Sequence, residues 1–350
     1  MLDKAVENRI LASLNHEEGD RVPVWDYIDN RAVMEYFAPG ENDYGKAMIK
    51  VYHGLGIDLC RGYGESFLES DNGTVRNDGN SVISGRSNWL VNYPIKTIED
   101  LKKFEPGRID ENALRTDWVR GNLASKAVLE PYTMWVPGRG CGFHETCRLM
   151  GQSLFAYAIY DAPEDLERVL GVIVDNSVAT AKVAAEAKIS PLFFIGDDMA
   201  YKGALMFSPQ YLRRTFIPAL RRVCEPLNNA EIKVIFHSDG YVMEILDDMI
   251  DAGIDGLNPI EPIAGMDIGF LKKRYGKNLI LVGNVDCSQV LPLGTVEQVV
   301  EATKECIRQA SPGGGHFIGS SSEIVPSTPV ENVLAFYQAC HQFGTYPIRV

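Results

Sequence analysis

A histidine and a carboxylate stand two residues apart in the segment 233–240, whose sequence is Lys-Val-Ile-Phe-His-Ser-Asp-Gly. The apolar, β-rich run 234–236 predicts a short buried strand. His237 and Asp239 follow at its carboxyl end, and residues two apart on an extended chain point to the same face. The pair therefore predicts a site that holds one metal ion or one substrate group.

A helix is predicted directly after this strand. Apolar residues recur at three- and four-residue spacing over 243–250, and Gly253 stands where a helix commonly ends. In parallel α/β folds the active site is built at the carboxyl ends of the strands. We therefore expect His237 and Asp239 at the catalytic end of such a sheet.

The rest of the chain repeats the order of strand and helix. Eight strand candidates are spread over its length, at residues 21–28, 57–63, 126–137, 191–195, 233–240, 254–259, 278–284 and 315–319. This alternation predicts a parallel sheet covered by helices, and eight units in one run favour a closed (β/α)8 TIM-type barrel. A doubly wound sheet would carry a glycine-rich phosphate loop, but 138–142 lacks its spacing. We predict a single barrel domain over residues 1–350.

One segment breaks the alternation. Residues 73–93 are hydrophilic and contain Asn-Gly and Asp-Gly pairs. Asp78-Gly79 between Val75 and Val82 predicts a β-hairpin inserted into the barrel.

Composition limits the class of protein. A chain of 350 residues with 45% apolar residues can bury a large core, and its net charge of -13 argues against nucleic acid or an anionic membrane surface as partner. No apolar run approaches the about 20 residues of a membrane helix. The seven cysteines are scattered, which favours reduced thiols. With no hydrophobic signal core at the N-terminus, we expect a soluble cytoplasmic protein; a homodimer is left open.

A barrel brings the residues that follow its strands to one mouth. The predicted mouth carries His237 among many acids and hydroxyls: Asp26, Glu130, Asp197, Asp198, Asp239, Glu261, Asp286 and residues 320–323. Crowded carboxylates raise one another's pKa unless a cation sits among them. A divalent metal resolves this, and histidine with carboxylates suits zinc.

Structural interpretations of the same residues remain open. A single histidine after a strand is often only hydrogen-bonded, and Asp197-Asp198 has the character of an acidic pair at a helix N-terminus. Glu261, between two prolines, suits a loop hydrogen bond equally well. The aromatic residues Trp25, Tyr27, Phe67 and Trp135 are more often core than pocket.

Several motifs resemble the uroporphyrinogen decarboxylase superfamily. They lie at 196–203 (Gly-Asp-Asp-Met-Ala-Tyr-Lys-Gly), 207–209, 237–240, 256–262 (Gly-Leu-Asn-Pro-Ile-Glu-Pro), 283–286 and 312–315. The resemblance implies a (β/α)8 barrel, in agreement with the strand pattern. The superfamily contains true decarboxylases and cobalamin-dependent methyltransferases, which use zinc and exchange methyl groups with a corrinoid protein.

The decarboxylase branch fits this chain poorly. True decarboxylases carry an Arg-Gln-Ala-Gly-Arg segment that grips the porphyrinogen carboxylates. The matching residues 25–31 hold one arginine and two acids, which would repel that substrate. The chain also has Ser-Ser-Glu-Ile at 321–324, where the decarboxylases resemble Gly-His-Gly-Ile. The resemblance therefore favours the methyltransferase branch.

The metal site departs from that of the coenzyme M methyltransferases, which hold zinc with His-x-Cys and a later cysteine. Here Asp239 replaces the first cysteine, and Ser322 stands at the second, beside Glu323. The resemblance implies zinc at His237, Asp239 and Glu323. Oxygen ligands make a harder site than thiolates, which suits an ether oxygen better than a thiol.

The predicted reaction is demethylation of a small methoxylated compound, expected to be aromatic. The methyl group passes to cob(I)alamin on a separate corrinoid protein. Asp197 or Asp198 would protonate the leaving oxygen. The aromatic residues expected to line the substrate pocket are Trp25, Tyr27, Trp135 and Tyr241. Two alternatives stay open: a metal-independent uroporphyrinogen decarboxylase-like lyase acting on a small carboxylate, and a non-catalytic corrinoid-binding barrel.

Overall fold

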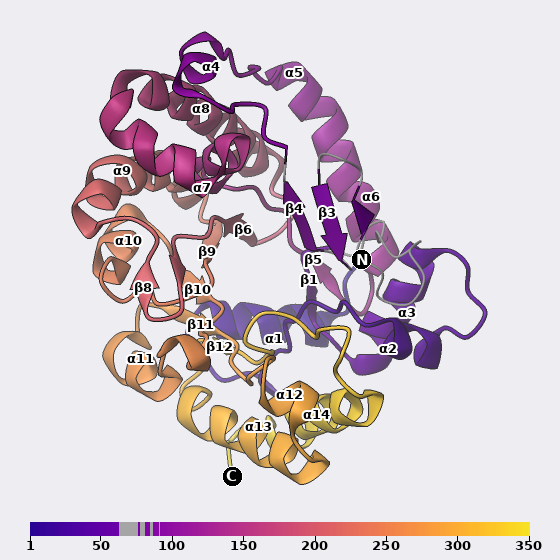
Figure 1. Cartoon of the computed structure of the whole chain (residues 1–350). Coiled ribbons are helices and arrows are strands. Elements are labelled where there is room, and N and C mark those ends of the chain that lie inside the picture. The colour runs from indigo at the N-terminus through magenta and orange to yellow at the C-terminus, as the bar shows by residue number, and fades with distance from the viewer. Residues whose placement is uncertain (63–75, 78–80, 85–86, 91) are drawn as a thin grey trace.

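The strands form an inner ring and the helices an outer one in the computed structural model of the chain (Figure 1). The structure describes residues 1–62, 76–77, 81–84, 87–90 and 92–350, so Phe67 lies outside the described residues. The alternation of strand and helix predicted from the sequence is present along most of this length.

Five parallel strands make the largest sheet, in the order β12-β11-β10-β9-β6. They are β6 (Leu192–Gly196), β9 (Lys233–His237), β10 (Gly256–Asn258), β11 (Ile280–Val282) and β12 (His316–Phe317). Strands β9, β10, β11 and β12 are neighbours in the order of the sequence, and β6 pairs with β9. Parallel neighbours of this kind are joined by crossover connections, which are usually helices.

Three further segments close the sheet into a ring. Val24 pairs with Ile318 beyond β12, and Trp25 pairs with Leu59 in β1 (Leu59–Cys60). Strand β1 pairs with β5 (Met134–Trp135), and Gly138 after β5 pairs with Phe194 in β6. All of these pairings are parallel, so the eight segments form a closed barrel, and the predicted fold class is confirmed.

Two layers of apolar side chains result from the alternation along each strand. In β6, Phe193 and Ile195 join the core between strands and helices, whereas Phe194 joins the cluster inside the barrel. In β9, Ile235 points inward in the same way. His237 is two residues further on, so its side chain points inward at the carboxyl end of the strand.

Helices enclose this ring. The crossovers and C-terminal segments supply α7 (Phe143–Asp161), α8 (Pro163–Ala187), α9 (Pro209–Asn229), α10 (Leu246–Ala252), α11 (Ile268–Tyr275), α12 (Val290–Leu293), α13 (Val296–Ala310) and α14 (Val330–Phe343). The N-terminal third supplies α1 (Lys4–Leu14), α2 (Arg31–Phe37), α3 (Tyr44–Leu55), α4 (Ile98–Lys103), α5 (Glu111–Ala113) and α6 (Val119–Leu129). Ile10 and Leu14 of α1 belong to the cluster inside the barrel.

The inserted segment forms a small antiparallel sheet. Strand β2 (Arg76–Asn77) pairs with β3 (Ser81–Ser84), as the predicted hairpin requires. A third strand, β4 (Ser87–Leu90), extends it. The predicted turn residues Asp78 and Gly79 lie outside the described residues.

The strand predicted over 126–137 is wrong in its first half. Helix α6 continues to Leu129, and β5 covers Met134–Trp135 alone. Glu130 therefore precedes the strand instead of following one, and lies far from the predicted mouth. No helix among the described residues is long and apolar enough to cross a membrane.

Candidate metal and substrate site

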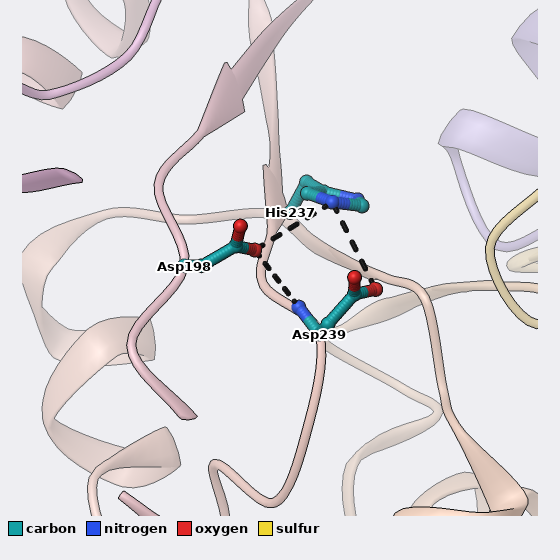
Figure 2. Close-up of side chains that lie close together, drawn as sticks. All are labelled: Asp198, His237 and Asp239. Carbon is teal, nitrogen blue, oxygen red and sulfur yellow. Dashed lines mark hydrogen bonds and ion pairs between the residues drawn. The ribbon is translucent and has the colours of Figure 1, made fainter. Parts of the chain in front are cut away.

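Three side chains converge at the carboxyl ends of β6 and β9 (Figure 2). The His237 Nε2 atom lies 3.8 Å from Asp198 Oδ1 and 3.9 Å from Asp239 Oδ1. These separations are too long for hydrogen bonds. Two zinc–ligand bonds of about 2.0–2.2 Å can bridge them. The predicted placement of His237 and Asp239 on one face is confirmed.

The loop geometry follows from each residue of the His-Ser-Asp-Gly motif. The Ser238 hydroxyl accepts a hydrogen bond from the Met199 N–H, which ties the loop after β9 to the loop after β6. Gly240 has φ of 86°, and a Cβ there would lie 2.5 Å from the Tyr201 backbone nitrogen. Only glycine fits such a close approach, so Asp239 is held beside Asp198.

The His237 ring is fixed by its other nitrogen. Nδ1 lies 2.7 Å from Asn258 Oδ1, which can only accept, so Nδ1 carries the proton. The Nε2 lone pair then faces Asp198 and Asp239. An outer hydrogen bond that sets the tautomer in this way is usual for histidine ligands of metals. Sequence reasoning missed Asn258, although it lies within the motif at 256–262.

Asp239 has an oxygen atom that is available to bind a cation. Its Oδ1 atom is buried, and no described residue hydrogen-bonds to it. Burial raises the pKa of the Asp239 carboxyl, and the nearby Asp198 charge adds to this, while His237 and Arg61 oppose it. The side chain of Ser322, where the resemblance placed a cysteine, hydrogen-bonds to Asp239. A cation between these groups would satisfy the orphaned oxygen, so the residues present fit a zinc ion.

Asp198, which the sequence analysis proposed as an acid, lies with His237 and Asp239. The cluster with mutually close ligand atoms contains Asp198, His237 and Asp239 within the described part of the chain. Glu323 directly follows Ser322 and stays a prediction as an additional ligand. Asp198 Oδ1 also accepts the Asp239 N–H at 3.2 Å, which orients its carboxylate.

Asp197 lies away from the reacting site. Its carboxylate is 2% exposed and accepts the N–H groups of Cys141, Phe143 and His144 at the start of α7. Burial raises its pKa, and these hydrogen bonds oppose the rise. The helix N-terminal interpretation that the sequence left open fits these contacts. We therefore place no proton transfer on Asp197.

The four predicted pocket aromatics separate into two groups. Tyr27 and Tyr241 lie in loops at the barrel mouth, where Tyr241 lies against Gly265. Trp25 packs inside the barrel, with ring centroids 6.0 Å from Phe194 and 5.9 Å from Phe317. Its prediction as a substrate contact needs correction, because the rings of the barrel interior enclose it.

Trp135 also needs correction. Its indole N–H donates to Asn122 Oδ1 in α6, and it lines a cavity of about 540 Å³ with Pro191 and Ile232. Those residues precede β6 and β9, so this cavity is at the amino ends of the strands. Glu130 lines the same cavity and pairs with the N-terminal ammonium.

A second cavity, of about 580 Å³, opens beside Asp198. His144 lies next to that carboxylate, with Nδ1 3.6 Å from Asp198 Oδ2. The remaining wall is mainly apolar and aromatic, from Tyr93, Phe143, Met150, Leu154, Met206 and Phe207. No sequence pattern predicts this wall, because it is assembled from three separate segments.

The mouth also contains Glu261 and Asp286. Glu261 Oε2 accepts the Gly240 N–H at 2.9 Å, and burial raises the pKa of this carboxyl. Asp286 accepts the N–H groups of residues 288–290 ahead of α12. Both are thus loop hydrogen-bond acceptors, and Glu261 is the one that directly supports the loop carrying Asp239.

Comparison with known proteins supports this architecture. Residues 90–343 match the family described as Uroporphyrinogen decarboxylase (URO-D). A methyltransferase from Methanosarcina mazei has the same fold, with a TM-score of 0.72 at 23% identity over 97% of this chain and 98% of that one.

Curated relatives come from both branches of the family. The Methylcobamide:CoM methyltransferase MtaA of Methanosarcina barkeri is 27% identical over 51% of this chain and 49% of its own length. The Uroporphyrinogen decarboxylase of Alkalilimnicola ehrlichii is 24% identical over 73% of this chain and 69% of its own. The chain spans about half the length of the curated methyltransferases that it matches. Because the family match covers more than half of its residues, the chain belongs to the uroporphyrinogen decarboxylase family.

Proposed function

We propose that this chain is a corrinoid-dependent methyltransferase that takes a methyl group from a small methoxylated compound. The observation that carries the proposal is the cluster of Asp198, His237 and Asp239, with an unprotonated histidine nitrogen facing two carboxylates. A relative of this chain is named as a methylcobamide methyltransferase, which supports the same branch.

The three cluster residues would hold a zinc ion, and Glu323 is a candidate additional ligand. Bound there, zinc would act as a Lewis acid toward the ether oxygen of the methyl donor. A site of one nitrogen and several oxygen donors is harder than a thiolate site. It therefore suits an oxygen leaving group, which is our reason for preferring a methoxylated donor over a methylated thiol.

The transfer balances as a displacement at carbon. The methyl–oxygen bond breaks with its electron pair left on oxygen, and the methyl acceptor, cob(I)alamin on a separate corrinoid protein, supplies the pair for the new bond. The released oxygen takes a proton to give the phenol or alcohol. Asp198 would itself be a zinc ligand and Asp197 is hydrogen-bonded to the start of α7, so we draw this proton from solvent.

The test mixes the purified protein with a reduced corrinoid protein and a panel of methoxyarenes. We expect the cobalamin spectrum to change from that of cob(I)alamin to that of methylcobalamin, with an equal amount of demethylated product. A mixture of the two proteins without a methyl donor serves as the blank. No spectral change with any donor would refute the proposal.

A lyase acting on a small carboxylate is the second candidate. The extent of the match to a named decarboxylase, 73% of this chain, favours keeping it. It predicts carbon dioxide release from a carboxylate substrate, undiminished by a metal chelator. The chelator therefore separates the two candidates.

A further inference from the structure

Arg61 occupies an unusual position at the barrel mouth. It follows β1 at the carboxyl end, and its guanidinium carbon lies 4.6 Å from the Tyr27 ring centroid and 4.5 Å from that of Phe194. The His237 ring is also a neighbour of Phe194, at 5.4 Å between centroids. Arg61 and the metal cluster are thus neighbours of the same Phe194 ring.

The Arg61 guanidinium has no hydrogen bond or ion pair to any other residue that the structure describes. Contact with two aromatic rings holds its position by cation–π attraction. The five N–H donors of its planar fork are thus unused by the described part of the chain. This is uncommon for a half-buried arginine, and it leaves the fork available to a ligand.

The electrostatic setting of Arg61 is equally specific. It lies close enough to Asp239 for the two charges to interact. The acids around it are otherwise engaged: Asp198 accepts the Asp239 N–H, and Glu261 accepts the Gly240 N–H. A positive group among the acids of the mouth attracts an anion to its own position.

We propose that Arg61 binds a carboxylate of the methyl donor, so that the donor is a small methoxylated carboxylic acid and not a neutral ether. A carboxylate matches the guanidinium fork in two parallel hydrogen bonds. With that end held at Arg61, the ether end of a small molecule can reach toward His237, because both residues are neighbours of the Phe194 ring. This inference rests on the proposed function and names its substrate class.

The test measures binding without the corrinoid protein, so that no turnover is needed. Zinc-loaded protein is titrated calorimetrically with 4-methoxybenzoate and with the neutral 4-methoxybenzamide. The variants are Arg61→Gln, which removes the charge, and Arg61→Lys, which keeps the charge but loses the fork. Arg214→Gln is the matched control, because the exposed Arg214 also lies over a ring, 5.6 Å from the Tyr211 centroid.

We expect the natural protein to bind the benzoate at least tenfold more tightly than the amide. Arg61→Gln should abolish that preference, Arg61→Lys should retain part of it, and Arg214→Gln should leave it unchanged. Thermal unfolding of each variant checks that the fold is kept. Weak or absent benzoate binding by the natural protein, or a preference that survives in Arg61→Gln, would overturn the inference.

The methyl-transfer assay with the same proteins separates the two proposals. Arg61-dependent binding of the benzoate without methyl transfer from any donor would leave the Arg61 assignment intact and refute the reaction. Methyl transfer from neutral ethers at the rate of the acids, unaffected by Arg61→Gln, would refute the Arg61 assignment and leave the reaction intact.

Discussion

Two groups of carboxylates at opposite ends of the barrel differ in the partners that the protein provides. At the amino ends, Asp58 is 2% exposed and bonded to Arg9 at 2.6 Å and to Arg21 at 2.8 Å. The Val24 N–H adds a third bond, at 2.7 Å. At the carboxyl ends, Asp198 and Asp239 lie within 4 Å of His237 and have no arginine or lysine partner among the described residues.

One histidine at each end shows the same difference in hydrogen bonding. His316 begins β12 and uses both ring nitrogens, with Ser311 Oγ at 2.9 Å and the Gly283 carbonyl at 2.7 Å. His237 ends β9 and uses only Nδ1 in a hydrogen bond. At the amino ends the protein satisfies its own polar groups, which stabilises the fold. At the carboxyl ends it leaves them for a ligand, which is the arrangement expected of a barrel active site.

The largest effect should come from removing the proposed metal ligand. His237→Ala should weaken zinc binding by about 1000-fold or more, since even outer-shell partners contribute 10–100-fold. Zinc per protein, measured after dialysis, should fall from near one to near zero, and methyl transfer should disappear. Asp198→Asn should behave in the same way, whereas Glu323→Gln should show a smaller loss if Glu323 is only an additional ligand.

The control for this prediction is the fold itself. A mouth residue contributes little to the core, so the thermal midpoint of His237→Ala in a chelator should equal that of the chelated natural protein. Full zinc content in His237→Ala would remove the metal site from this end of the barrel.

The next effect concerns the opposite end. Asp58→Asn should lower the free energy of unfolding by about 3 kcal/mol, because Arg21 loses its carboxylate partner and Arg9 keeps only Asp20. Urea unfolding of the metal-free protein measures this change. Asp198→Asn is the matched control and should change stability little. Equal losses in the two variants would abolish the distinction between the two ends.

Much of this comparison could be predicted from the sequence, because apolar runs locate strands and the period of two fixes the faces. The placement of His237 and Asp239 followed in this way. The prediction for Trp135 failed for a physical reason: Met134 and Val136 point into the barrel, so Trp135 between them points outward to α6. The prediction for Glu130 failed because α6 extends to Leu129, which leaves Glu130 at the amino end of the strand.

Contacts between strands were beyond the sequence. Asn258 meets His237 because β9 and β10 are neighbours in register, with these two residues paired. Asp198 joins the cluster because β6 flanks β9 on its other side. Arg61 depends on the same closure of the ring, since its partner Phe194 lies more than 130 positions away. A linear pattern shows which residues end strands but not which side chains then meet.

A third effect uses pH to compare the two histidines. Burial lowers the pKa of His316 to about 3, against 6.5 for an unfolded histidine. The unfolded chain therefore binds a proton first, so stability is complete above pH 6.5 and is lost as the pH falls toward 3. This one group can contribute up to about 1.4 kcal/mol per pH unit over that range.

His316→Gln should flatten this dependence, although it also lowers stability at neutral pH by disturbing the bonds to Ser311 and Gly283. Urea unfolding at pH 7.5, 6, 5 and 4 gives the slope for both proteins. Identical slopes would mean that other groups dominate the acid sensitivity.

The smallest effect tests whether the His237 ring is held ready for a metal. Asn258→Ala removes the oxygen that accepts the Nδ1 proton, so the ring can rotate and change tautomer. Zinc affinity should fall by about 10–100-fold without loss of the fold. Asn258→Asp is the matched variant, because a carboxylate still accepts that proton and should restore most of the affinity. Competition with a zinc chelator of known affinity measures all three proteins. If Asn258→Ala binds zinc as tightly as the natural protein, Asn258 serves only to join β9 and β10. The His237 ring would then not be oriented in advance for a metal, and the contrast between the two ends of the barrel would be weaker.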